Sequence, residues 1–215
     1  MKNFIKNISK WSSSMKLGTA IAIGGVVLLG TSILYANSTG NDLTTSSPKP
    51  TISITIDPVV NEEVEEIVRP YVVNCEIGHY FYDESDSSEI REKAIVNVPG
   101  SNRTYMLSEG CDYTYNGETF DVVAVVSGTI TDKMTDPTFG EVVILTHENG
   151  VKFIYSSLSL TKVNKGQTVK QGEVIAKSGK SVYTSSFESS LHFEVVKDDK
   201  HLKPEKIYTT SIENL

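Results

Sequence analysis

The sequence has little cysteine and a deficit of basic residues, and each shortage excludes a class of protein. Two cysteines, Cys75 and Cys111, are too few for a disulfide scaffold or a four-cysteine zinc site, although a single bridge or two buried thiols both fit. A net charge of −7 and a pI near 5.2 argue against nucleic acid as the main partner, because phosphate neutralisation needs a basic surface. The composition, 39% apolar and 22% charged, indicates a modest globular domain.

Long uncharged apolar runs are also scarce, and the sequence has one, at residues 17–36. Twenty residues at about 1.5 Å rise span about 30 Å, the thickness of a bilayer core, which predicts a transmembrane helix. Residues 1–16 carry four lysines and no acidic residue, so they are expected to form a cytoplasmic tail, with the C-terminal domain extracytoplasmic. A cleaved signal peptide is the rival interpretation, but Leu34-Tyr35-Ala36 is a poor cleavage signal and the apolar run is too long. The expected location is therefore the cell membrane, with a single pass.

The next part of the chain is predicted to contain a flexible linker at residues 37–60 and a mixed lead segment at residues 61–104. The linker begins with a stretch rich in Asn, Ser, Thr and Pro that cannot bury a core. In the lead segment, Asn61 is a candidate cap for a helix through Val68, and residues 85–92 favour a helical turn.

The remaining sequence predicts a mainly β domain, with antiparallel strands in two sheets. Short β-prone runs alternate with turn signals, and no long amphipathic helix interrupts them. Asn149-Gly150 between two such runs predicts a hairpin. The runs are Ala94–Val98, Thr104–Leu107, Asp121–Ile130, Glu141–His147, Lys152–Leu158, Thr168–Ala176 and Leu191–Lys197.

Three motifs occur in one order along residues 107–205. They are V-V-I-L-T-H-E-N-G followed by I-Y-S-S-L, then V-N-K-G-Q-T-V-K-Q-G-E-V-I-A-K-S-G, then L-H-F-E-V. Together they resemble the M23 (lysostaphin/LytM-type) zinc endopeptidases, which cleave cell-wall peptides. The resemblance implies an M23 peptidase-like β domain at residues 105–208.

The resemblance also implies a zinc site, from which this sequence departs. Ser108 stands at the first ligand position, where the family has histidine, while Asp112 and His192 stand at the other two ligand positions. Ser157 and Ser190 occupy the positions of the two catalytic histidines. A catalytic zinc ion normally has three protein ligands, and each lost acid–base histidine lowers the rate by roughly 10²–10⁴-fold.

We therefore expect a catalytically inactive domain with no catalytic residues. No cofactor is expected. Zinc would be bound only if the vestigial ligand positions Ser108, Asp112 and His192 still bind it. Of the other histidines, His79 lies in the lead segment, His147 beside the Asn149-Gly150 turn and His201 in a polar turn. The alternative function is an active zinc endopeptidase that cleaves peptidoglycan peptides.

A narrower resemblance includes the lead segment and the layout of the anchor. The stretches R-T-Y-M-L-S-E-G-C-D at 103–112 and K-S-G-K at 177–180 are similar to the stage II sporulation protein Q family. This resemblance implies a forespore membrane protein whose domain docks with a stage III sporulation protein AH-like protein of the mother-cell membrane, in a channel between the cells. The implied partners are that protein and the lipid bilayer around residues 17–36, without nucleic acid.

Docking is expected to use strand addition at a sheet edge, because an exposed edge offers unpaired backbone groups to a partner strand. Apolar side chains of the lead segment either contribute to this surface or cover the core of the β domain. They are Tyr71, Val73, Tyr80 and Tyr82.

Overall fold

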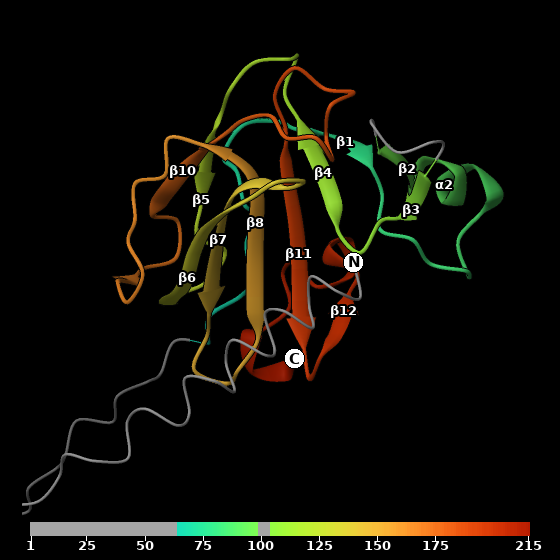
Figure 1. Ribbon diagram of the computed structural model, residues 1–215. Helices are drawn as coiled ribbons and strands as arrows, with labels where there is room; N and C mark the ends of the chain where they lie inside the picture. Colours follow the sequence, from blue (N-terminus) through green and yellow to red (C-terminus); the bar gives the residue numbers. More distant parts are fainter. Residues whose placement is uncertain (1–63, 99–103) are drawn as a thin grey trace, which may run out of the picture. The chain divides into compact units, whose positions relative to one another are not determined.

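A computed structural model describes residues 64–98 and 104–215, which fold as a mainly β protein (Figure 1). The predicted transmembrane span at 17–36 and the predicted linker at 37–60 lie outside these residues. Among the described residues, no helix is both long and apolar enough to cross a bilayer. The strands are β1 (Glu76–His79), β2 (Ile95–Val98), β3 (Thr104–Leu107), β4 (Cys111–Thr114), β5 (Asp121–Val123), β6 (Gly128–Asp136), β7 (Gly140–Thr146), β8 (Lys152–Ser159), β9 (Thr168–Val169), β10 (Val174–Ser178), β11 (Leu191–Lys197) and β12 (Lys200–Leu202).

The strands pair antiparallel, which confirms the predicted class of fold. The main sheet has the order β1-β4-β11-β8-β7-β6-β9, with β12 beside β11 and with β10 paired to both β8 and β5. The second sheet is the separate β2–β3 pair, next to the short helix α2 (Ser88–Lys93) (Figure 1). Two single-turn helices, η2 (Pro204–Lys206) and η3 (Ile212–Asn214), end the chain.

Several predicted elements are confirmed at their sites. Helix α2 lies within the turn expected near residues 85–92, and the Ser87 hydroxyl accepts the Ile90 N–H at its start. The Asn149-Gly150 turn joins β7 to β8, and Gly150 has φ of +88°, which glycine adopts without a Cβ penalty. Strand β1 lies inside residues 71–82, whose sequence is β-prone, whereas the sequence pattern missed β4 and β12, which are four and three residues long.

Two predicted strands are each divided in the structure because local groups take the backbone hydrogen bonds. Between β5 and β6, the Val125 N–H donates to the Tyr155 hydroxyl and the Ser127 N–H donates to the Glu65 carboxylate. Between β9 and β10, the chain turns at Gly172, whose φ is +77°. In both places, side-chain contacts or a turn replace the strand-to-strand hydrogen bonds that the β-prone sequence alone predicts.

The predicted helix from Asn61 to Val68 is wrong for its described part, residues 64–68. Ile67 is 1% exposed in the core, and its N–H donates to the Thr210 carbonyl. The Val68 N–H donates to the Val125 carbonyl. Burial of Ile67 in an extended strand-like segment therefore overrides the local helical preference.

The core lies against the main sheet and is closed by the lead segment. Tyr71 packs with its ring centroid 4.9 Å from that of Tyr113, and Val73 also packs against the core. Tyr71 and Val73 thus cover the core of the β domain. Of the two roles expected for the apolar side chains of the lead segment, docking or covering the core, these two have the second. Cys75 and Cys111 are both free thiols.

Candidate functional site

Two of the three vestigial ligand positions, Asp112 and His192, come together because three strands run side by side. In the register of the main sheet, Asp112 on β4 is opposite His192 on β11, and it is opposite His79 of β1 on its other side. Asp112 and His192 are fully buried, and the side chain of His79 is 17% exposed. The structure thus brings Asp112 and His192 together as the sequence predicts and adds His79.

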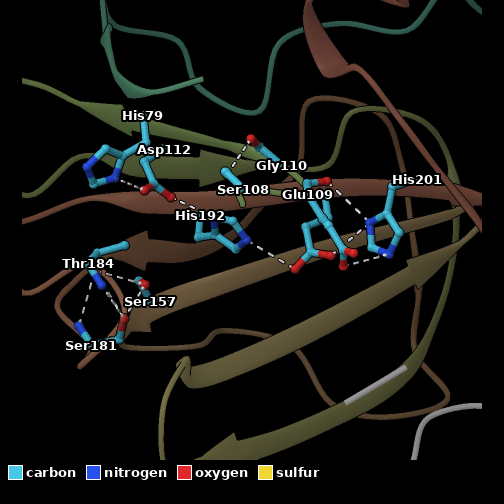
Figure 2. Close-up of polar contacts among 11 residues, drawn as sticks. His79, Ser108, Glu109, Gly110, Asp112, Ser157, Ser181, Thr184, His192 and His201 are labelled. Carbon is cyan, nitrogen blue, oxygen red and sulfur yellow. Dashed lines mark hydrogen bonds and ion pairs between the residues drawn. The ribbon is translucent and has the colours of Figure 1, made fainter. Parts of the chain in front are cut away.

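Asp112 is held between two imidazoles (Figure 2). Its Oδ1 lies 2.6 Å from His192 Nδ1, and its Oδ2 lies 2.6 Å from His79 Nδ1. Burial acts to raise the pKa of Asp112, but the two histidines outweigh it and lower that pKa. His79 belongs to no motif, and its role follows from the pairing of β1 with β4, which the local sequence does not predict.

The network continues past His192 through acids and histidines in alternation (Figure 2). His192 Nε2 lies 3.1 Å from Glu194 Oε1, and Glu194 Oε2 lies 3.1 Å from His201 Nδ1. His201 Nε2 lies 3.3 Å from Glu109 Oε2. His192 and Glu194 are two positions apart on β11, so their side chains lie on the same face of the sheet.

The charged forms of the central pair are strongly favoured. Burial acts to lower the pKa of His192, but Asp112 and Glu194 outweigh it and raise that pKa to about 10. Burial acts to raise the pKa of Glu194, but His192 and His201 lower it to about 2. A protonated His192 between two carboxylates is therefore the state that the geometry stabilises.

Two of the three serines at the family's histidine positions form hydrogen bonds through their hydroxyls, and the third does not. The Ser108 hydroxyl donates to the Gly110 carbonyl at 2.9 Å. Ser157 has φ of +58°, and its hydroxyl lies 2.7 Å from the Ser181 hydroxyl and 3.1 Å from that of Thr184. Ser190 is fully buried, and its hydroxyl makes no hydrogen bond within the described residues.

The side chains present do not fit the zinc ion that an M23 fold implies. Both oxygens of Asp112 and both ring nitrogens of His192 are taken by neighbours within the network. His79 supplies a further imidazole, but Asp112 lies between it and His192, so the two rings do not converge on a common point (Figure 2). We therefore derive no hydrolytic step through a metal at these residues.

A protein-family model and a related protein both match this sequence in a way that agrees with the fold. The model of Peptidase family M23 matches residues 107–204. The chain is 32% identical to stage II sporulation protein Q of Bacillus subtilis (strain 168) over 209 residues, which are 93% of this chain and 73% of that protein. The M23 match thus extends over most of the predicted domain at 105–208.

Solved structures give the same result. One chain of the SpoIIQ–SpoIIIAH pore-forming complex matches with a TM-score of 0.66 and 35% identity, over 70% of this chain and 96% of that chain. A zinc-containing peptidase from Vibrio cholerae matches with a TM-score of 0.50 and 21% identity, over 64% and 39% of the two chains, and shows the fold alone. The chain therefore belongs to the stage II sporulation protein Q family, which is built on the M23 peptidase fold.

Proposed function

We propose that this protein is a membrane-anchored docking module of sporulation with an M23-type domain that does not hydrolyse peptides. The observation that supports it most is the buried network, in which Asp112 and His192 bind neighbouring side chains rather than present open ligand atoms. Serine hydroxyls at 108, 157 and 190 offer no acid–base group near neutral pH. In this proposal the M23-type domain acts by binding a partner protein through its surface.

The proposed partner is a stage III sporulation protein AH-like protein in the opposing mother-cell membrane. The support comes from the relatives, since a chain 35% identical to this one was solved in the SpoIIQ–SpoIIIAH complex. Such a complex joins the forespore side to the mother-cell side of a channel.

The β2–β3 pair is the proposed docking surface. Its strands belong to no larger sheet in the described part of the chain, so their outer edges are open to a partner strand. On one face, Ile95, Tyr105 and Leu107 are 41%, 62% and 51% exposed. In the register, Ile95 is opposite Leu107 and Tyr105 is opposite Asn97, so these side chains form one apolar patch. Val96, on the other face, is 1% exposed and packs inward.

The proposed topology follows from charge and length. Residues 17–36 cross the membrane, 1–16 stay in the cytoplasm, and the linker at 37–60 carries the lead segment (61–104) and the β domain (105–208) outside. Reporter fusions at residue 215 test this, because a reporter active only outside the cytoplasm should be active there. A cytoplasmic location of residue 215 would contradict the topology.

The functional test compares binding with cleavage. The full chain in detergent micelles is titrated with the soluble domain of the stage III sporulation protein AH-like protein from the same organism, and is incubated separately with purified peptidoglycan. We expect a saturable complex and no release of peptidoglycan fragments. Fragment release by the wild-type chain, without complex formation, would instead establish the active endopeptidase.

A further inference from the structure

We infer that Glu109, Glu194 and His201 form a divalent-cation site, separate from the vestigial zinc positions, that takes a transition metal of the Zn²⁺ class. These residues come from three parts of the chain: the turn before β4, strand β11 and strand β12. One ligand atom from each lies within 4.8 Å of those of the other two. Figure 2 shows the Glu109 and His201 side chains turned toward one another.

The atoms that face the centre of this cluster are buried and lack hydrogen bonds. They are Glu109 Oε2, Glu194 Oε2 and His201 Nε2, and none makes a hydrogen bond within the described residues. Only ion-pair contacts of 3.1–3.3 Å join them through the His201 ring. Buried polar atoms without hydrogen bonds are rare and often mark the place of an ion or water.

The backbone is shaped to bring Glu109 to this point. A Cβ at Gly110 would lie 2.3 Å from the Phe193 carbonyl oxygen and 2.8 Å from Glu194 Cγ. Only glycine therefore allows the turn after Glu109 to rest directly on β11. The His201 ring is fixed as well, because its Nδ1 lies 3.2 Å from the Glu109 carbonyl oxygen.

The donor set suits the proposed ion. One imidazole and two carboxylates are ligands that Zn²⁺ accepts, with a water in the remaining position. Two ligand atoms at about 2.1 Å from a tetrahedral ion lie about 3.4 Å apart. Glu109 Oε2 lies 3.3 Å from His201 Nε2, and one ligand atom of Glu194 lies within 4.8 Å of those of both residues. Glu194 is fully buried and the His201 side chain is 10% exposed, whereas Glu109 is 33% exposed and leaves an entry path.

The second acidic cluster with a histidine is a weaker candidate and serves as a control. In it, His147 is joined by Glu148 and Glu213, which are both exposed. His147 Nδ1 accepts the Asn149 N–H at 3.3 Å, which uses one ring nitrogen for the turn.

The test uses the untagged full chain in detergent micelles, first stripped of metal with a chelator. Equilibrium dialysis against ZnCl₂ should show one Zn²⁺ bound per chain. Glu109→Gln and His201→Gln should each weaken binding by at least about tenfold, because each removes a direct ligand. Glu148→Gln and Ser108→Ala, the controls for the second cluster and the vestigial site, should leave the affinity unchanged.

Rescue separates coordination from charge. Glu109→His restores a ligand atom without restoring the negative charge, and it should bind Zn²⁺ more tightly than Glu109→Gln does. Glu109 is partly exposed, so its variants should fold, which circular dichroism checks. Absence of stoichiometric binding by the wild-type chain, or unchanged affinity in both Glu109→Gln and His201→Gln, would overturn the inference.

Discussion

The network around Asp112 and the β2–β3 pair differ in what they bury and what they expose. The network hides charge, with Asp112, His192 and Glu194 fully buried within the main sheet. The β2–β3 pair exposes apolar side chains, with Tyr105 62% and Leu107 51% accessible. Buried paired charges fix a structure, whereas an exposed apolar patch beside open edges is a surface for a partner. This difference supports our proposal that docking takes place outside the former cleft.

The largest expected effect follows from removing the centre of the network. Asp112→Ala leaves His79 without its carboxylate partner and His192 with Glu194 alone, and breaking a buried ion pair costs about 3–5 kcal/mol. Urea denaturation should show this loss in the free energy of unfolding. Ser108→Ala is the matched control, because it removes only one hydrogen bond, worth about 1 kcal/mol. Equal stability of the two variants would show that the network is not a structural element.

The pH dependence of stability is the next test of the network. The pKa of His192 is raised from 6.5 in the unfolded chain to about 10 in the folded chain, so its contribution is complete below pH 6.5. Stability should therefore fall as pH rises from 6.5 toward 10, because over this range the folded chain holds a proton on His192 that the unfolded chain has released.

Denaturation series at several pH values, with the metal chelated, measure this decline. His192→Gln should flatten the part of the decline that comes from this ring. An unchanged slope in the variant would mean that His192 is neutral in the folded protein.

Docking should depend on the apolar patch. Tyr105→Ala removes a large exposed aromatic side chain from the proposed interface, and it should weaken partner binding by about 2 kcal/mol, or roughly 30-fold. Val72→Ala is the matched control, since Val72 is 75% exposed but lies outside the β2–β3 pair. Calorimetric titration measures both, and a larger loss with Val72→Ala would move the interface from the β2–β3 pair to the chain around Val72.

The smallest effect concerns the stability of the same patch. Leu107→Thr should change the free energy of unfolding by less than about 0.5 kcal/mol, because the side chain is half exposed and β-branched threonine suits a strand. Val96→Thr, on the buried face of the neighbouring strand, should cost about 1–3 kcal/mol. A large loss with Leu107→Thr would indicate that this face packs within the protein.

The sequence predicted the fold and part of the site for identifiable reasons. Alternation and the Asn149-Gly150 turn are local signals, so β7 and β8 were found nearly at their observed bounds. The helix through Val68 was wrong because burial of Ile67, a tertiary effect, decides the conformation there. Asp112 and His192 were found by their motifs, whereas His79 joins them through the pairing of β1 with β4, which no local signal predicts.

The central claim is that the exposed β2–β3 pair, and not the former cleft, carries the function. Calorimetric titration of the partner domain into Leu107→Asp and Ser157→Ala variants tests it most directly. Leu107→Asp places a charge in the apolar patch, whereas Ser157→Ala changes a position at which M23 enzymes have a catalytic histidine. We predict that Leu107→Asp abolishes binding and that Ser157→Ala retains the wild-type affinity. Binding that survives Leu107→Asp but is lost in Ser157→Ala would contradict the account.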